Sequence, residues 1–182
     1  MFAGGATSSG VPGPPDAVIR AYRAGTGELR WSSTIPGAGG EEPSLSATGG
    51  VLAFSGASDQ GFPDTDFLVR GYDPPTGQLL WDRRVDYPGS FDRSLDVLGV
   101  GAQVWASGTS GNCDAFDVSV DCRFTVRTYD AKTGAELFAD DGGDGGEDVA
   151  FALAESSGRV FAGGLTSTAA DPPDVLLRAY RP

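Results

Sequence analysis

Val18-Ile19-Arg20-Ala21-Tyr22 is the first of four copies of one pattern, in which a small residue separates an arginine from a tyrosine. The other copies are Leu68-Val69-Arg70-Gly71-Tyr72, Thr125-Val126-Arg127-Thr128-Tyr129 and Leu176-Leu177-Arg178-Ala179-Tyr180. Their tyrosines recur at intervals of about 50 residues, which is the size of one β-propeller blade. The repeat therefore predicts an all-β protein, a β-propeller built of four-stranded antiparallel blades.

A second pattern and the residues after each tyrosine define the repeat unit more fully. Three copies continue at fixed offsets into Thr-Gly and an aromatic residue, which is Trp31, Trp81 or Phe138. An aromatic residue followed closely by glycine precedes each tyrosine, as in Phe54-Ser55-Gly56. We letter the expected strands A (small and apolar), B (aromatic-glycine), C (Arg-Tyr) and D (Thr-Gly, then the aromatic residue).

In this notation the chain reads B-C-D, A-B-C-D, A-B-C-D, A-B-C, so the first and last blades are incomplete. That order gives about 3.5 blades and 14 strands in a single propeller domain or segment, residues 1–182. The repeat units span about 1–42, 43–92, 93–146 and 147–182. Because incomplete blades expose edges and apolar faces, we expect either a homodimer or contact with the missing blades of a longer chain.

Composition excludes several classes of function. The formal net charge is −12, with no histidine and a single lysine, and this argues against binding to nucleic acid or to anionic membranes. No apolar run approaches the length of a membrane helix, so we expect no membrane partner. The first residues lack a basic flank and an apolar stretch, so we expect no leader within this chain.

The two cysteines flank the longest insertion in the repeat. Cys113 and Cys122 enclose a stretch rich in aspartate, and we expect a disulfide that fixes this loop. Two alternatives remain open, namely a pair of free thiols in the cytoplasm and a zinc site, although a zinc ion would lack further ligands. A disulfide favours an extracytoplasmic location, whether secreted, periplasmic or at the cell surface.

The run from Ala21 to Trp31, with its counterparts from Gly71 to Trp81 and from Thr128 to Phe138, resembles the tryptophan-docking repeat of quinoprotein-like (PQQ-like) β-propellers. It is also similar to the repeats of bacterial secreted propeller proteins. The resemblance implies that a small residue of strand C receives the tryptophan of the adjacent blade. The implied acceptors are Ala21, Gly71 and Ala179, and the implied docking aromatics are Trp31, Trp81 and Phe138. The third copy departs from the pattern, since Thr128 is its acceptor and Phe138 its aromatic residue, so docking there should be looser.

The arginines of the repeat have acidic residues nearby in the sequence. Asp16, Asp66 and Asp174 each precede such an arginine by four residues. We expect exposed ion pairs between these residues, each contributing a few tenths of a kcal/mol.

Acidic residues gather where the B–C and D–A connections would emerge. In propellers these connections share one face, so most of the 25 acidic residues are expected on a single negative face. The densest cluster contains Asp140, Asp141, Asp144 and Asp148 among glycines, and such oxygen ligands suit Ca²⁺. The cluster lacks the EF-hand spacing, and the alternative is a solvated acidic loop.

Catalysis has little support in the sequence. The absence of histidine excludes Ser-His and Cys-His triads. A quinone-dependent dehydrogenase, which the resemblance would permit, typically uses an asparagine near Ca²⁺ and adjacent cysteines. Here Asn112 is the only asparagine and the two cysteines are separated, so we expect neither PQQ nor another cofactor, with calcium the one candidate.

The preferred interpretation is a non-catalytic scaffold or binding module that presents an acidic loop face to a protein, glycan or cation. One alternative is a fragment of a quinone-dependent dehydrogenase, or of another propeller enzyme, whose catalytic residues lie outside this chain. The other alternative is a structural repeat of a surface or adhesion protein.

Overall fold

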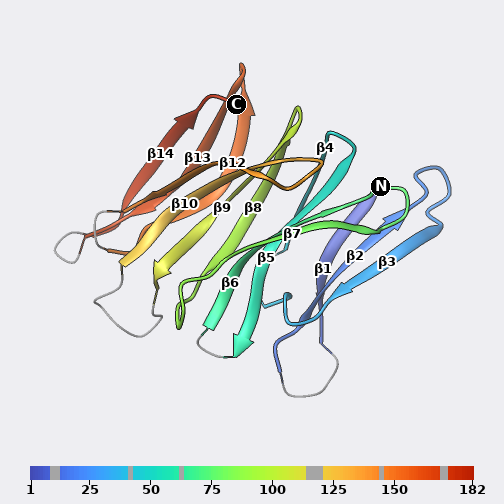
Figure 1. Cartoon of the computed structure of the whole chain (residues 1–182), viewed down its shortest axis with the longest axis horizontal. Helices are drawn as coiled ribbons and strands as arrows, with labels where there is room; N and C mark the ends of the chain where they lie inside the picture. Colours follow the sequence, from blue (N-terminus) through green and yellow to red (C-terminus); the bar gives the residue numbers. More distant parts are fainter. Residues whose placement is uncertain (9–12, 41–42, 62–63, 114–120, 144–145, 169–171) are drawn as a thin grey trace.

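The structure is a computed structural model that describes residues 1–8, 13–40, 43–61, 64–113, 121–143, 146–168 and 172–182. Its 14 strands form four antiparallel sheets that stand side by side in chain order (Figure 1). We call these sheets blades 1 to 4. This arrangement confirms the predicted all-β fold with incomplete first and last blades.

The strand bounds show which strand each terminal blade lacks. Blade 1 contains β1 (Phe2–Thr7), β2 (Asp16–Tyr22) and β3 (Leu29–Ile35). Blade 2 contains β4 (Ser44–Thr48), β5 (Val51–Gly61), β6 (Asp64–Tyr72) and β7 (Leu79–Val85). Blade 3 contains β8 (Arg93–Val100), β9 (Gln103–Asn112), β10 (Asp121–Asp130) and β11 (Glu136–Gly142). Blade 4 contains β12 (Val149–Ser156), β13 (Arg159–Thr166) and β14 (Asp174–Tyr180). Within the described residues, no helix is long and apolar enough to span a membrane.

The core lies between the blades rather than within one of them. Each Arg-Tyr strand alternates its side chains between two faces. In β6, Phe67 and Val69 face blade 3 and pack on residues such as Val104, while Leu68 and Tyr72 face blade 1 and pack on residues such as Ile19. Both faces of an internal blade are therefore apolar and covered.

Trp81 fastens blade 2 to blade 3. Its ring covers Gly71, the cross-strand partner of Trp81 in the same blade, so closely that a Cβ on Gly71 would collide with Cε2 of the indole. The indole N–H donates to the carbonyl oxygen of Ala131 at 2.8 Å, and the ring lies against Gly134, both in the C–D turn of blade 3. We expected the small acceptor to lie in the neighbouring blade. Instead it lies beside the tryptophan, because strands C and D pair directly, and the neighbour supplies the turn.

Trp31 repeats this arrangement one blade earlier. It is the cross-strand partner of Ala21, it donates to the carbonyl oxygen of Pro74 at 2.9 Å, and it lies against Gly77. Gly77 and Gly134 both adopt positive φ, at 75° and 66°, as tight C–D turns require of glycine. A β-carbon at either position would also collide with the docked ring.

The third aromatic residue docks differently. Phe138 is the cross-strand partner of Thr128 and packs with Trp105 and Tyr180. It is 43% exposed, compared with 5% for Trp81, and it borders a cavity of about 230 Å³. Ala179 is exposed in β14, and no described residue docks on it in the manner of a tryptophan.

Arg70, Arg127 and Arg178 pair with acids on other strands and not with a residue four positions earlier on their own strand, contrary to our expectation. Arg70 pairs with its cross-strand neighbour Asp82 at 2.7 Å, while Asp66 pairs with Arg84 at 3.1 Å. Residues four apart on a strand are separated by about 13 Å, whereas cross-strand neighbours lie about 5 Å apart. Sequence proximity therefore indicated the wrong partner.

Candidate functional site: the loop end

The B–C and D–A connections meet at one end of the blades, which we call the loop end. Hydrogen bonds tie connections of neighbouring repeats together there: the Asp59 N–H donates to the carbonyl oxygen of Gly37, and the Cys122 N–H donates to that of Gly146, each at 3.0 Å. The A–B and C–D turns form the opposite end, the turn end, where a β-carbon on Gly49 would contact Ala131. The sheets thus separate the two sets of connections.

Charge differs between the two ends. The turn end carries bases as well as acids, namely Arg23, Arg30, Lys132, Arg159 and Arg181 beside Glu28, Asp73, Asp130, Glu136 and Glu155. At the loop end the exposed acids among the described residues are Asp86, Asp121, Glu147 and Asp174. The bases nearest to them are Arg84, Arg93 and Arg123. Because further acids lie beneath these exposed ones, the described part of the loop end has an excess of negative charge.

Several loop-end acids are structural, which counting charges along the sequence does not reveal. Asp16 accepts from the N–H of Gly37 at 3.0 Å, and Asp64 accepts from the N–H of Gly89 at 3.1 Å. A carboxylate that accepts backbone hydrogen bonds satisfies donors that a turn leaves unpaired. These acids shape the connections, so they are part of the framework of the loop end as well as of its negative charge.

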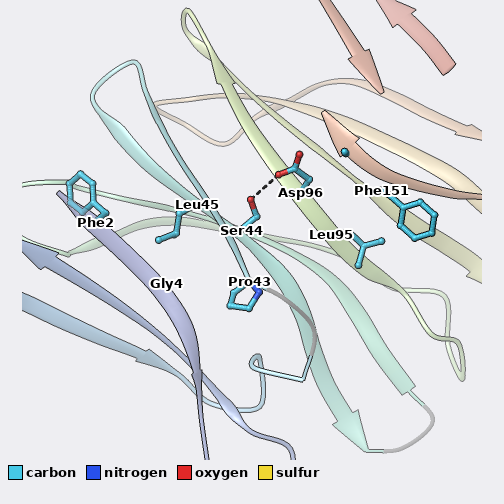
Figure 2. A pocket seen from close by; sticks show the side chains of 9 residues that line it. Phe2, Gly4, Pro43, Ser44, Leu45, Leu95, Asp96 and Phe151 are labelled. Carbon is cyan, nitrogen blue, oxygen red and sulfur yellow. Dashed lines mark hydrogen bonds between the residues drawn. The ribbon is translucent and has the colours of Figure 1, made fainter. Parts of the chain in front are cut away.

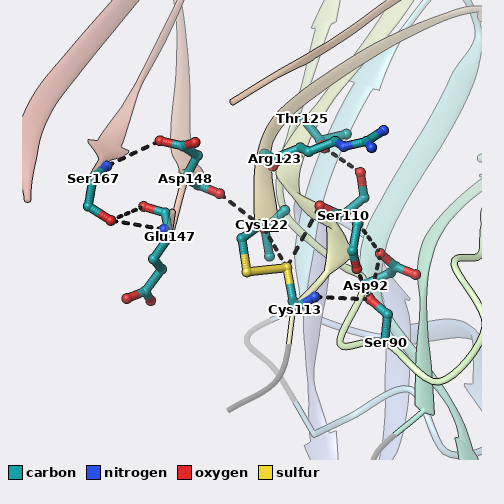
Figure 3. The surroundings of a disulfide bond; sticks show 12 residues. Ser90, Asp92, Ser110, Cys113, Cys122, Arg123, Thr125, Glu147, Asp148 and Ser167 are labelled. Carbon is teal, nitrogen blue, oxygen red and sulfur yellow. Dashed lines mark hydrogen bonds between the residues drawn. A yellow bond between two sulfur atoms is a disulfide. The ribbon is translucent and has the colours of Figure 1, made fainter. Parts of the chain in front are cut away.

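Asp92 is the most buried of these structural acids, with no exposed surface. Figure 3 shows its side chain beside Ser90. Its carboxylate accepts from the N–H of Tyr87 at 2.6 Å, from the N–H of Gly111 at 2.9 Å and from the hydroxyl of Ser90. Burial raises the pKa of Asp92 to about 6, against the opposing effect of these hydrogen bonds. Asp92 thereby joins the D–A connection of blade 2 to strand β9 of blade 3.

The predicted disulfide is present, linking Cys113 to Cys122 with their Cα atoms 4.8 Å apart (Figure 3). It closes the end of the β9–β10 hairpin, and both cysteines are buried. Thr109 Oγ1 lies 3.3 Å from Cys113 Sγ and donates to the carbonyl oxygen of Asp148 at 3.0 Å. The disulfide therefore sits in the polar network that connects blades 3 and 4.

The four proposed calcium ligands are placed in different environments. Asp140 and Asp141 belong to β11, where neighbouring side chains point to opposite faces. Asp140 pairs with Arg178 at 2.8 Å, and Asp141 pairs with Arg127. Asp148 is buried and accepts from the Ser167 N–H at 3.2 Å, while Asp144 lies outside the described residues.

The described members of the predicted calcium-ligand set, Asp140, Asp141 and Asp148, do not converge on one point. Among the described residues, no group of three or more acidic, cysteine or histidine side chains is arranged to hold a metal ion. Calcium binding by this segment stays a prediction, and it would require Asp140 and Asp141 to release their arginines.

A second feature, which was not predicted from the sequence, is a cleft of about 500 Å³ between the innermost strands (Figure 2). Its lining residues are Phe2, Gly4, Pro43, Ser44, Leu45, Leu95, Asp96, Phe151 and Ala152. Asp96 accepts from the hydroxyl of Ser44 and from the N–H of Leu153, each at 2.8 Å, so it bridges the inner strands of blades 2, 3 and 4. The sequence signal that could have indicated this cleft was Asp96, an aspartate in a strand A that is otherwise mostly small and apolar.

Solved structures similar to this chain exist, although no family model and no curated protein matches it. Among solved structures, the chain is similar to BamB from Moraxella catarrhalis, with a TM-score of 0.52 and 12% sequence identity over 96% of this chain and 42% of BamB. It also aligns with Sqt1 from Saccharomyces cerevisiae, with a TM-score of 0.36 and 13% identity over 89% of this chain and 55% of Sqt1. The chain thus spans less than half the length of BamB, and the likeness to that propeller shows that its fold is that of a β-propeller.

Proposed function

We propose that this chain is a non-catalytic β-propeller scaffold that binds a basic partner surface at its acidic loop end. The observation that carries this proposal is the difference in charge between the two ends. Exposed acids at the loop end, such as Asp86 and Glu147, lie above a framework of buried acids, whereas bases accompany the acids at the turn end. A negative surface attracts cationic groups and repels anionic ones.

The organisation of the loop end supports a binding role. The disulfide and the Asp92 hydrogen bonds join the described parts of the connections between β7 and β8 and between β9 and β10 to the strands beside them. Fixed loops bind with a smaller loss of conformational entropy than mobile ones. The described residues also contain no histidine or free cysteine that could act as a nucleophile or base. A binding surface therefore agrees better with this end than a catalytic centre does.

Two finer assignments accompany this proposal. The contacts of Trp31 and Trp81 with glycine turns of the next blade support membership of the PQQ-like repeat class. The disulfide supports an extracytoplasmic location, because reducing compartments rarely maintain such bonds.

A short oligoarginine peptide is a suitable probe for the loop end. We expect saturable binding that weakens as salt is added, with amide NMR shifts concentrated around Asp86, Asp121, Glu147 and Asp174. Replacing these four with Asn or Gln should abolish the shifts. The matched control replaces Glu28, Glu136 and Glu155 at the turn end and should leave binding unchanged. Equal shifts at both ends, or an equal effect of both sets of substitutions, would refute the proposal.

A further inference from the structure

Blade 4 exposes apolar side chains at positions that are buried in every other blade. Val175 is 86% exposed and Leu177 is 67% exposed. The residues at the corresponding repeat positions are all 0% exposed, namely Ala17 and Ile19 in blade 1, Phe67 and Val69 in blade 2, and Phe124 and Val126 in blade 3. We call the surface around Val175 and Leu177 the leading face.

Blade 1 has an uncovered surface on the side that points away from blade 2. The carbonyl oxygen of Met1 accepts from the N–H of Tyr22, so Met1 takes the position that Leu52, Val104 and Val160 hold in the later blades. Met1 is 68% exposed, whereas those three residues are at most 1% exposed. Beside it runs a groove of about 280 Å³ lined by Ala3, Gly5, Val18, Arg20 and Tyr22, among others. We call this surface the trailing face.

The three internal boundaries show what covers each face. At each one, the positions equivalent to Val175 and Leu177 pack on the next blade, against the positions equivalent to Met1 and to the groove. At the boundary of blades 3 and 4, for example, Phe124 and Val126 pack with Val160 and Ala162. The chain thus contains three examples of this interface and two uncovered faces that correspond to its halves, without strand D in blade 4 and without strand A in blade 1.

We propose that the leading face of this chain binds the trailing face of a second copy, and that two such contacts close a ring of two chains. Both halves of the interface are present in one sequence, so a second copy supplies both missing partners at once. The contacts join unlike surfaces, and contacts of that kind close into a ring when the rotation between copies permits. The chain matches 42% of BamB, a share that favours two copies in a propeller of that size over three.

The trailing groove offers space for the leading side chains. A Cβ added to Gly5 would meet no atom within 4 Å, so the groove is open at its middle. Val175 and Leu177 are the exposed residues whose equivalents fill this space at internal boundaries. The transfer of these apolar side chains from water into the groove would favour association.

Ring formation would also complete the inner cleft. Phe2 in blade 1 and Phe151 in blade 4 are among its lining residues (Figure 2). A second copy would place its own inner strands opposite these residues. The cleft would then become one half of an axial channel, and Asp96 from both copies would lie along it.

Light scattering on the size-fractionated chain tests this inference over a broad range of protein concentration. We expect a species of twice the 18.7 kDa chain mass, which dissociates on dilution. Leu177→Glu on the leading face and Val18→Glu on the trailing face should each weaken the dimer about tenfold or more, because each would bury an unpaired charge. Leu80→Glu, at a leucine that is 45% exposed on β7 of blade 2, away from both faces, is the control and should leave the dimer intact.

Mixing the two variants distinguishes this geometry from other dimers. A Leu177→Glu copy retains its trailing face and a Val18→Glu copy retains its leading face, so the mixture should recover a dimer through one intact contact. If Val18→Glu fails to fold by circular dichroism, Ala3→Glu at an exposed position of the same groove replaces it. A wild-type chain that stays monomeric, a dimer that either variant leaves unchanged, or a mixture without recovery would overturn the inference. None of these results bears on peptide binding at the loop end, so the two proposals fail separately.

Discussion

Trp81 and Ala131, 50 residues apart in the chain, are joined by a 2.8 Å hydrogen bond from the indole N–H to the carbonyl oxygen. The bond crosses the boundary between blades 2 and 3, and both residues are buried. Trp31 makes the same contact with Pro74 one blade earlier, at 2.9 Å, but is only half-buried. A repeated tryptophan therefore joins blade 1 to blade 2 and blade 2 to blade 3, and the strength of each contact depends on how well water is excluded.

Trp81→Phe should destabilise the protein by about 2–4 kcal/mol. The change leaves the buried Ala131 carbonyl oxygen without its indole donor and opens a cavity beside Gly134. Trp31→Phe should cost less, because water can reach the carbonyl oxygen of Pro74. Urea denaturation of both variants measures the difference. Equal losses for the two variants would contradict this explanation.

Gly71→Ala should also be destabilising, by about 1–3 kcal/mol, although alanine generally suits a strand better than glycine. The added methyl group would collide with Cε2 of Trp81, and the buried indole is held in place by its neighbours. The reverse change at the equivalent position, Ala21→Gly, should cost about 1 kcal/mol or less. Thermal denaturation compares the two, and a neutral Gly71→Ala variant would show that Trp81 can shift without penalty.

The repeat was sufficient to predict the fold, because it encodes both the strand order and the contacts between blades. Tyr22, Tyr72 and Tyr129 mark the same strand in successive blades, and the glycines after them, Gly27, Gly77 and Gly134, mark the turns. The acceptor of Trp81 was misplaced for a physical reason. A repeat reports which residues correspond, but cross-strand pairing decides that Gly71 lies under Trp81 in the same blade.

The loop end was less predictable, because burial of acids depends on contacts distant in the sequence. Asp92 has no exposed surface, and Asp140 is held by Arg178 from the next blade. Sequence spacing shows these residues as free charges. It could not show that they accept hydrogen bonds from groups 19 and 38 residues away.

Removing the disulfide through a Cys113→Ser, Cys122→Ser double variant should lower the free energy of unfolding by about 2–3 kcal/mol. The loop is short, with a sequence separation of 9, so the entropic contribution is modest. Chemical denaturation of the wild type with and without reductant should show a loss of similar size. The double variant should not respond to reductant. A reductant effect in that variant would mean that the loss has another cause.

Asp140→Ala should loosen blade 4 selectively. The Asp140 carboxylate accepts from Arg178 and from the hydroxyl of Tyr180, each at 2.8 Å, and both donors belong to β14. We expect faster hydrogen exchange in β14 and a loss of about 1–2 kcal/mol, since these groups are half-buried. Glu28→Ala is the control, because its pair with Arg23 is more than 60% exposed on both sides and should contribute little. Unchanged exchange in β14 would rule out this role for Asp140.

Asp92 should make stability depend on pH in the direction opposite to most acids. Its pKa is about 6 in the folded chain, above the ordinary value of 3.8, because burial disfavours the carboxylate. Between pH 3.8 and 6 the folded state therefore binds more protons at this site than the unfolded state does. Linkage requires that stability from Asp92 is highest below that window, falls as pH rises through it, and is constant above it.

Asp92→Asn isolates this contribution from the other acids. The variant should be less stable at every pH, because an amide oxygen cannot replace two carboxylate oxygens toward Tyr87 and Gly111. The wild type should gain stability relative to the variant as pH falls from about 6 to 4, by at most about 1.4 kcal/mol per pH unit. Asp121→Asn, at an exposed acid of the same end, should show no such trend. A constant difference between wild type and Asp92→Asn would mean that Asp92 stays ionised through the window, because its hydrogen bonds outweigh the cost of burial.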